Sequence, residues 1–96
     1  MSTAVASGPD RDRLAVEQVL AFLLYGGSDI GAAKCVLVVI AASKGNLKLS
    51  EVKLVMNTIR THTSLDAHFI YGTTYDDSLN DEIRVTVVIT GINFEV

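Results

Sequence analysis

Two histidines, His62 and His68, are the residues of this chain whose type first suggests catalysis or metal binding. An imidazole can act as a general base or hold a metal ion, but a metal site needs three or four converging ligands. The two histidines are not spaced i, i+4 on a helix, and no cysteine lies near them in the sequence. The pattern therefore favours two structural histidines.

An acidic segment and a single cysteine are the other candidates for chemistry. The acidic segment comprises Asp76, Asp77, Asp81 and Glu82. It lacks the Asp-x-Asp-x-Asp-Gly spacing of a calcium loop, so a solvated turn is the favoured interpretation. Cys35 opens the most apolar segment of the chain, where burial is expected to raise the pKa of a thiol and make it unreactive. We therefore expect no catalytic residue and no metal site.

The glycines do not form a phosphate-binding loop. Gly26-Gly27 and Gly45 fit neither Gly-x-Gly-x-x-Gly nor Gly-x-x-x-x-Gly-Lys-Ser/Thr, the two patterns that cradle nucleotide phosphates at a strand-to-helix turn. We therefore expect no cofactor bound by this chain.

Composition limits which partners the protein is expected to bind and where in the cell it is expected to work. The chain has 96 residues, 49% of them hydrophobic, and a net charge of -3, which together indicate one folded domain. Its Lys and Arg residues are scattered rather than clustered, so nucleic acid is not an expected partner. The longest apolar run, 35–42, is far shorter than the roughly 20 residues that cross a bilayer. No signal peptide is visible and there is one cysteine, so we expect a cytoplasmic protein.

Hydrophobic periodicity and turn residues predict six elements that would position these side chains. The predicted strands are about 1–6, 35–42, 68–75 and 83–91, and the predicted helices are about 9–25 and 50–61.

The first helix has a start, a core stripe and a stop. Pro9 suits a first helical position, and Gly26-Gly27 offers a left-handed end. The predicted core stripe is Val16, Val19, Leu20, Leu23 and Leu24. Phe22 and Tyr25 make the last two turns apolar almost all the way round, which is typical of a helix that is buried on several sides or that faces a partner.

The hydrophobic patterns of the remaining segments predict how each one packs in the fold. The continuous apolar run 35–42 is typical of a central strand covered on both faces. Ser50 is the expected N-cap of the second helix, whose core stripe is Val52, Val55, Met56 and Ile59. In the last strand Ile83, Val85, Val87 and Ile89 should face inward.

The connections define the fold class. The short loop 76–82 predicts an antiparallel hairpin of strands 68–75 and 83–91. The two helical crossovers should join parallel strands. The expected fold is α/β of the α+β kind: a β-α-β-α-β-β two-layer sandwich with a four-stranded mixed sheet and two helices.

The segment 80–92, Asn-Asp-Glu-Ile-Arg-Val-Thr-Val-Val-Ile-Thr-Gly-Ile, closely resembles the last strand of the C-terminal domain of the FtsZ family, the bacterial homologues of tubulin. Further segments resemble the same domain in the same order: 5–8 with 10–11, 29–40, 47–52 with 57–60, and 70–73. The resemblance implies that residues 1–96 form one FtsZ-like C-terminal domain of a cell-division protein.

The resemblance also implies a function without catalysis in this chain. In the family, GTP is bound by a separate N-terminal domain, and the next subunit's acidic loop completes hydrolysis. Neither the family's phosphate loop nor its Asn-x-Asp-x-x-Asp motif is present in this sequence. The implied role is therefore polymerisation, with GTP belonging to the parent protein. The implied partners are a GTPase domain of the same or a neighbouring subunit and a division-inhibitor protein, at the division ring.

The family's filament contact can be carried over to this chain by position. It would comprise Asn46, Leu47, Lys48, Leu49, Val52 and Lys53. Leu47 and Leu49 precede the core stripe, so one of them is expected to project as an apolar anchor ringed by charge. Alternatively, both leucines pack as a hydrophobic staple at the start of the helix. A candidate face for a homo-oligomer is Phe22, Leu24 and Tyr25.

Two alternative functions remain open. One is an excised or redesigned self-associating α/β scaffold without activity, to which the apolar end of the first helix would contribute. The other is a small enzyme of chorismate-mutase-like architecture, whose anionic substrate would require converging arginines. The arginines Arg11, Arg13, Arg60 and Arg84 fall on separate predicted elements with no motif joining them.

Overall fold

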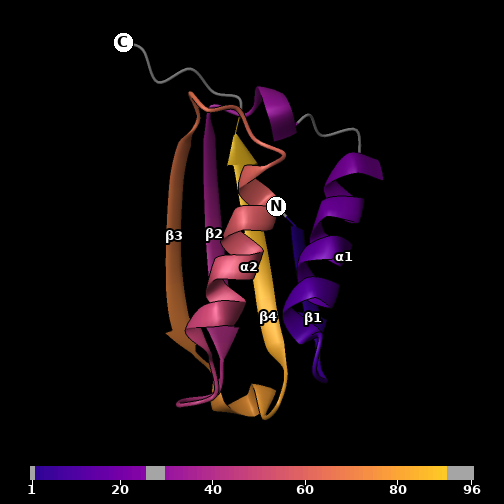
Figure 1. The fold of residues 1–96 in the computed structure, drawn as a ribbon, viewed down its shortest axis with the longest axis vertical. Helices are drawn as coiled ribbons and strands as arrows, with labels where there is room; N and C mark the ends of the chain where they lie inside the picture. The colour runs from indigo at the N-terminus through magenta and orange to yellow at the C-terminus, as the bar shows by residue number, and fades with distance from the viewer. Residues whose placement is uncertain (1, 26–29, 91–96) are drawn as a thin grey trace.

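A computed structural model describes residues 2–25 and 30–90 of the chain. Within these residues the main elements are β1 (Ser2–Ala6), α1 (Arg11–Tyr25), β2 (Cys35–Ala42), α2 (Leu49–Arg60), β3 (His68–Tyr75) and β4 (Ile83–Thr90) (Figure 1). Two short 3-10 turns, η1 (Ile30–Ala32) and η2 (Asp77–Leu79), precede β2 and β4. The predicted element order is confirmed.

The strands form a mixed sheet in the order β1-β4-β2-β3. β2 pairs with β3 in parallel and with β4 antiparallel, and β4 also pairs antiparallel with β1. β1 and β2 therefore run parallel with β4 between them, and β2 and β3 are parallel neighbours, as expected for the two helical crossovers.

The predicted hairpin of β3 and β4 is wrong, because β2 lies between these strands. The connection passes round the end of β2, where the Asp76 amide donates to the carbonyl of Ala42 at 2.9 Å. Neighbouring strands lie about 4.8 Å apart, so the loop 76–82 is long enough to step across one strand. This arrangement places the most apolar strand, β2, inside the sheet, as predicted.

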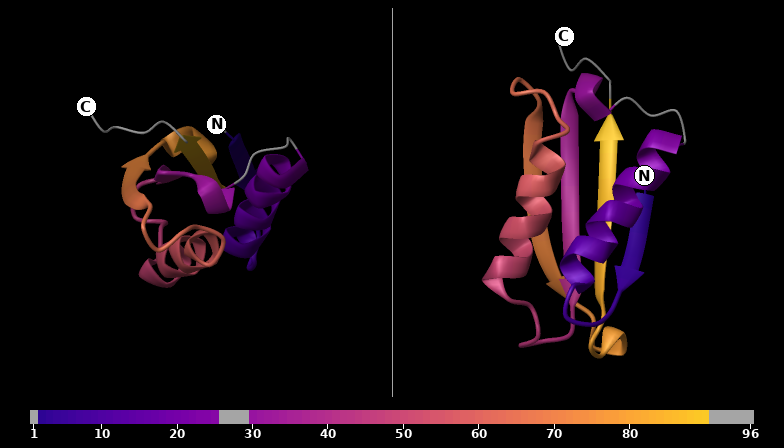
Figure 2. Two further views of the ribbon diagram at one scale, coloured as in Figure 1. Left: turned by 90° about the horizontal axis from the view of Figure 1, so that it is seen from above. Right: turned by 45° about the vertical axis from the view of Figure 1, so that its right-hand side comes forward.

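The helices α1 and α2 both lie on one face of the sheet, which makes the predicted two-layer sandwich (Figure 2). The expectation that β2 is covered on both faces is wrong. Val36, Val38 and Ile40 point towards the helices and are fully buried, whereas Leu37 and Val39 on the other face are half-buried. No described element covers that second face, which we call the open face.

The core lies between the helices and the sheet. On β4, Ile83, Val85 and Val87 are fully buried and Ile89 packs against the core, so the predicted inward face is confirmed. On α1 the stripe holds for Val16, Val19, Leu20 and Leu23. Leu24 does not belong to that stripe, because it is 54% exposed. A helix turns by about 100° per residue, which carries Leu24 past the edge of the buried stripe.

Both helices begin at residues other than those predicted. α1 begins at Arg11, because Gly8, with φ of 94°, turns the chain and accepts a hydrogen bond from the Arg11 amide at 3.2 Å. α2 begins at Leu49 with Lys48 as its N-cap, in place of Ser50. Gly26-Gly27, the predicted end of α1, lies outside the described residues, as do Met1 in the first predicted strand and Gly91 in the last. No helix in the described part of the chain is long and apolar enough to cross a membrane.

Candidate functional site

A buried ion pair joins the N-terminal turns of α1 and α2. The Arg11 guanidinium donates from Nε to Glu51 Oε2 at 2.6 Å and from Nη2 to Glu51 Oε1 at 2.7 Å. The two side chains are only 7% and 11% exposed. This bidentate geometry is the strongest form of an arginine–carboxylate contact.

The pair keeps both of its members charged. Hydrogen bonding from Arg11 outweighs burial and lowers the pKa of the Glu51 carboxyl below its usual value. The same hydrogen bond raises the pKa of Arg11. The pair therefore acts as a fixed bridge between the two helices at neutral pH.

The remaining donors of Arg11 hold two loops. Nη1 donates to the carbonyl of Asp81 at 2.8 Å, and Nη2 also donates to the carbonyl of Asn46. Glu51 Oε1 accepts the backbone N–H of Lys48 at 3.1 Å, which caps the start of α2. One arginine thus connects α1, α2 and the loops that precede α2 and β4. The sequence showed Arg11 only as one of several separate arginines, since no local pattern reveals that its partner lies forty positions away.

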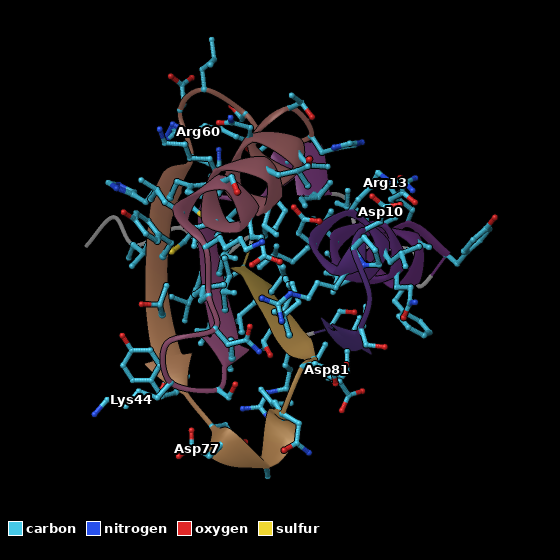
Figure 3. All side chains as sticks on the ribbon, turned by 60° about the horizontal axis from the view of Figure 1, so that its bottom comes forward. Asp10, Arg13, Lys44, Arg60, Asp77 and Asp81 are labelled. Atoms are coloured by element: carbon cyan, nitrogen blue, oxygen red, sulfur yellow. The ribbon has the colours of Figure 1, made fainter. Side chains whose placement is uncertain are left out.

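Further polar contacts join the same two loops. The Asn46 side-chain amide donates to the carbonyl of Asn80 at 2.8 Å, and the Ser43 hydroxyl donates to the same carbonyl at 2.6 Å. The Lys44 amide donates to Asp77 Oδ1 at 3.1 Å. Figure 3 looks towards this end of the molecule, where Lys44, Asp77 and Asp81 are labelled. The side-chain amide of Asn46 is therefore used inside the loop network.

The structure brings the other predicted interface residues together at the start of α2. Lys48 and Lys53 are exposed, Leu47 is half-buried against the core, and Val52 is 9% exposed. Leu49 is 69% exposed. Of the two interpretations considered for the leucines, the structure fits the one in which a single leucine projects: Leu47 packs against the core and Leu49 is exposed. We call Lys48, Leu49 and Lys53 the α2 face.

A groove of about 400 Å³ extends the α2 face between α2 and β3. Val52, Met56, Phe69 and Tyr71 contribute apolar surface to it, and Lys53 and Arg60 contribute positive charge. The Arg60 guanidinium lies 4.9 Å from the centre of the Phe69 ring.

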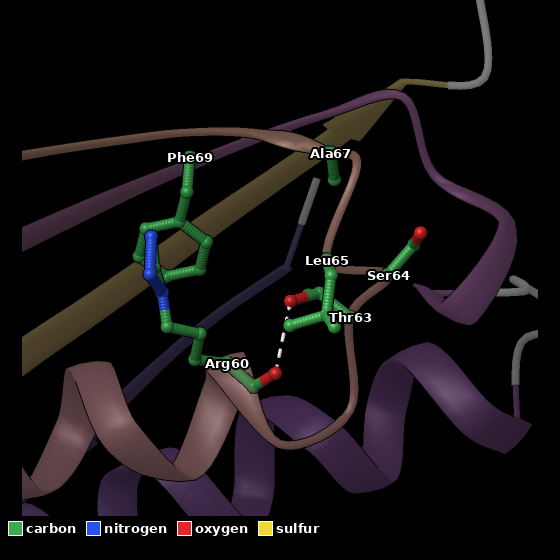
Figure 4. Close-up of a pocket in the computed structure, with 6 residues that line it drawn as sticks. All are labelled: Arg60, Thr63, Ser64, Leu65, Ala67 and Phe69. Carbon is green, nitrogen blue, oxygen red and sulfur yellow. Dashed lines mark hydrogen bonds between the residues drawn. The ribbon is translucent and has the colours of Figure 1, made fainter.

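Figure 4 shows this stacking of Arg60 on Phe69 beside the turn that follows α2, where the Thr63 hydroxyl donates to the Arg60 carbonyl at 3.0 Å. Arg60 and Phe69 therefore line the end of the groove next to this turn.

The candidate oligomer face lies at the C-terminal end of α1, at the opposite end of the molecule from the α2 face (Figure 1). Phe22 is 63% exposed, Leu24 is 54% exposed and Tyr25 is 92% exposed. Phe22 and Tyr25, three positions apart, share one side of the helix, whereas Leu24 points to a different side, since a helix turns by about 100° per residue.

The residues considered for chemistry do not assemble into a catalytic constellation in the structure. His62 and His68 are exposed, and the ring Nδ1 of His62 lies 3.0 Å from the Thr58 carbonyl. Among residues 2–25 and 30–90, no three His, Cys, Asp or Glu side chains converge to hold a metal ion. The expected burial of Cys35 is wrong, because its side chain lies on the open face at intermediate exposure.

Asp76 has a structural role in the acidic segment. Its carboxylate accepts hydrogen bonds from the amide and hydroxyl of Ser78 and pairs with Arg84 at 3.3 Å. The hydrogen bonds from Ser78 are the main reason that the pKa of Asp76 is lowered. Asp76 therefore caps the η2 turn.

The four-stranded mixed sheet with both helices on one face has the two-layer α+β architecture of a tubulin-like C-terminal domain. The model of the C-terminal domain of the FtsZ family matches residues 1–93. The chain belongs to the FtsZ family, whose C-terminal domain it comprises.

Known relatives agree with this assignment. The chain is 42% identical over 95 residues to the cell division protein FtsZ of Buchnera aphidicola from Schizaphis graminum, covering 99% of this chain and 24% of the relative. It is 38% identical over 92 residues to FtsZ of Coxiella burnetii, covering 96% of this chain and 24% of the relative. A solved FtsZ dimer of M. jannaschii superposes with a TM-score of 0.83 at 29% identity, covering 94% of this chain and 26% of that one. The chain thus spans about a quarter of the length of these relatives.

Proposed function

We propose that this domain supplies one face of the head-to-tail contact between subunits of a cell-division filament. The observation that carries the proposal is Leu49, which is 69% exposed between Lys48 and Lys53 at the start of α2. A large exposed apolar side chain beside an apolar groove is typical of an interface anchor. A likeness to an FtsZ that forms a dimer supports the proposal.

The energy available at this face is suitable for a reversible contact. Complete burial of a leucine side chain contributes about 1.5 to 3 kcal/mol. Lys53 has no acidic partner among the ion pairs of the described residues, and Lys48 lies near only Glu51, which Arg11 already pairs, so both lysines can attract an acidic partner surface and speed its association. A division-inhibitor protein would compete with the next subunit for the same face.

We infer that the open face of the sheet packs against the part of the parent protein that binds GTP. Leu37, Val39 and Val88 on this face are half-buried, and Ile70 is 54% exposed. The one arginine that β4 contributes, Arg84, is paired with Asp76. On this proposal GTP is bound and hydrolysed by the parent protein, at the cytoplasmic division ring.

The filament contact is tested by adding this domain to a full-length FtsZ, such as the Buchnera aphidicola relative, that polymerises with GTP. We expect the domain to occupy one end of the contact and to reduce the polymer that sediments. Leu49→Asp should abolish this inhibition, because a carboxylate cannot be buried in the apolar contact without a large desolvation cost.

Leu65→Asp is the matched control. Leu65 is fully exposed in the turn after α2, away from the α2 face. We expect this variant to inhibit as the unmodified domain does. Equal inhibition by the Leu49→Asp variant would contradict the assigned contact.

The apolar end of α1 favours self-association as a second candidate function. Phe22 and Tyr25 are more than half exposed on one short stretch of helix, and a second copy of the domain could cover them.

A further inference from the structure

We propose that Arg11 is a positioning residue for the α2 face: it holds the segment 46–49 in the orientation that presents Leu49. This role rests on the filament contact proposed above. Arg11 does not itself form part of the contact surface, since it is a buried residue.

The first step of the argument is the use of the guanidinium. It offers five N–H donors in a planar fork. The structure gives bonds from Nε and Nη2 to the Glu51 carboxylate, from Nη1 to the carbonyl of Asp81 and from Nη2 to the carbonyl of Asn46. A fork with bonds in several directions restrains the groups that it joins in both distance and angle.

The second step is that these bonds restrain the backbone just before Leu49. Arg11 holds the carbonyl of Asn46, and its partner Glu51 holds the backbone N–H of Lys48. Leu47, between these two points, packs against the core. The backbone is thus restrained on both sides of Leu47. This restraint comes immediately before Leu49, whose side chain projects into solvent.

The third step is that the start of α2 depends on this restraint. Its N-cap is Lys48, whose side chain has no acceptor and makes no capping bond. The capping bond comes from Glu51 alone, and the orientation of the Glu51 carboxylate is set by Arg11. By contrast, Ser43 and Asn46 bind the carbonyl of Asn80 without Arg11. Loss of Arg11 should therefore loosen 46–49 while the loop stays attached.

The test compares Arg11→Lys with Arg13→Lys. A lysine at position 11 keeps the charge beside Glu51, but one ammonium cannot bind the carboxylate and both loop carbonyls. Arg13 provides the matched control, because it lies on the same turn of α1 and makes only exposed pairs with Asp10 and Glu17. Both variants are assayed well below their melting temperatures, for inhibition of the sedimenting polymer and for amide hydrogen exchange.

We expect Arg11→Lys to raise the concentration of domain needed for half-inhibition by about tenfold, because the face must now be ordered on binding. The amide of Lys48, which donates to Glu51, should exchange about tenfold faster, while the amide of Val38 in β2 is unchanged. Arg13→Lys should alter neither measurement. A stabilising role alone would lower the melting temperature and leave both measurements unchanged at the assay temperature.

Glu51→Gln provides a second variant should Arg11→Lys fail to fold. Its amide keeps the size of the carboxyl group but replaces one acceptor of the fork with a donor, so inhibition should weaken several-fold. Undiminished inhibition by the folded Arg11 or Glu51 variant, in an assay where Leu49→Asp inhibits no longer, would overturn the positioning role alone. Full inhibition by Leu49→Asp would instead overturn the filament contact and with it the role of Arg11.

Discussion

A buried arginine–glutamate pair contributes to stability only while its hydrogen bonds are complete. Arg11 and Glu51 meet this condition: the guanidinium binds both carboxylate oxygens and two loop carbonyls, and the carboxylate also accepts the Lys48 amide. No buried side-chain nitrogen or oxygen in the described part of the chain lacks a partner. At the scale of single residues, this pair links the core to the α2 face.

The pH dependence of stability should report this pair. Because the pKa of Glu51 is lowered in the folded domain, its contribution is complete above the ordinary glutamate pKa and is lost as the pH falls through the folded value. We therefore expect the free energy of unfolding, measured by urea denaturation, to fall less steeply below about pH 5 in Glu51→Gln than in the unmodified domain.

Glu17→Gln controls for the loss of any carboxylate. Glu17 lies on the exposed side of α1, 3.6 Å from Arg13, and the two side chains are more than half exposed. Its variant should follow the pH profile of the unmodified domain. A profile for Glu51→Gln that runs parallel to both would show that the pair does not retain its charge in the way proposed.

Side chains on the two faces of the sheet differ in how deeply they are buried. On β4, Val87 points to the helices and is fully buried, whereas Val88 points to the open face and is half-buried. The alternation that placed these side chains was readable from the sequence because the strand period of two depends only on the local backbone. At the scale of elements, the helix face stabilises the fold and the open face is available for contacts.

Val87→Ala should lower the free energy of unfolding by about 1 to 3 kcal/mol, because it removes buried methyl groups and leaves a cavity. Val88→Ala, on the next residue and the opposite face, should cost less than half as much. Urea denaturation of the two variants measures this difference. Equal losses would show that the open face is packed as tightly as the core.

Strand pairing was less predictable than strand location. A short loop between 68–75 and 83–91 favoured a hairpin, yet β2 occupies the place between them. Loop length sets only an upper limit on the separation of two strands. Which strand fills the centre depends on the burial of the whole sheet, since β2 has the longest apolar run and gains most from two neighbours.

The N-cap of α2 was misplaced for a similar reason, because Glu51 caps the helix through its contact with Arg11.

The proposed contact surfaces lie at several sites of the molecule. The α2 face lies at one end and the apolar end of α1 lies at the other end (Figures 1 and 2). The open face is the side of the sheet away from the helices. This distribution suits a domain that is packed against its own parent chain while it contacts neighbouring subunits.

The apolar end of α1 can be tested by the molar mass of the domain in solution. If a second copy covers Phe22 and Tyr25, size-exclusion chromatography with light scattering should give a dimer or larger species whose mass falls with dilution. The double substitution Phe22→Ser and Tyr25→Ser should return the domain to a monomer, because it removes the exposed apolar area. A monomer for the unmodified domain at high concentration would contradict self-association.

The sequence by itself determined the element types and order, the inward face of β4, most of the buried stripe on α1 and the resemblance to the FtsZ family. These features depend on local periodicity and on motifs read along the chain. Only the tertiary structure decided the place of β2 between β3 and β4, the uncovered face of the sheet, the exposure of Leu49 and the bridge from Arg11 to Glu51. The physical reason is that these features arise from contacts between residues far apart in the chain, whose hydrogen bonds and buried area depend on the packing of the whole domain.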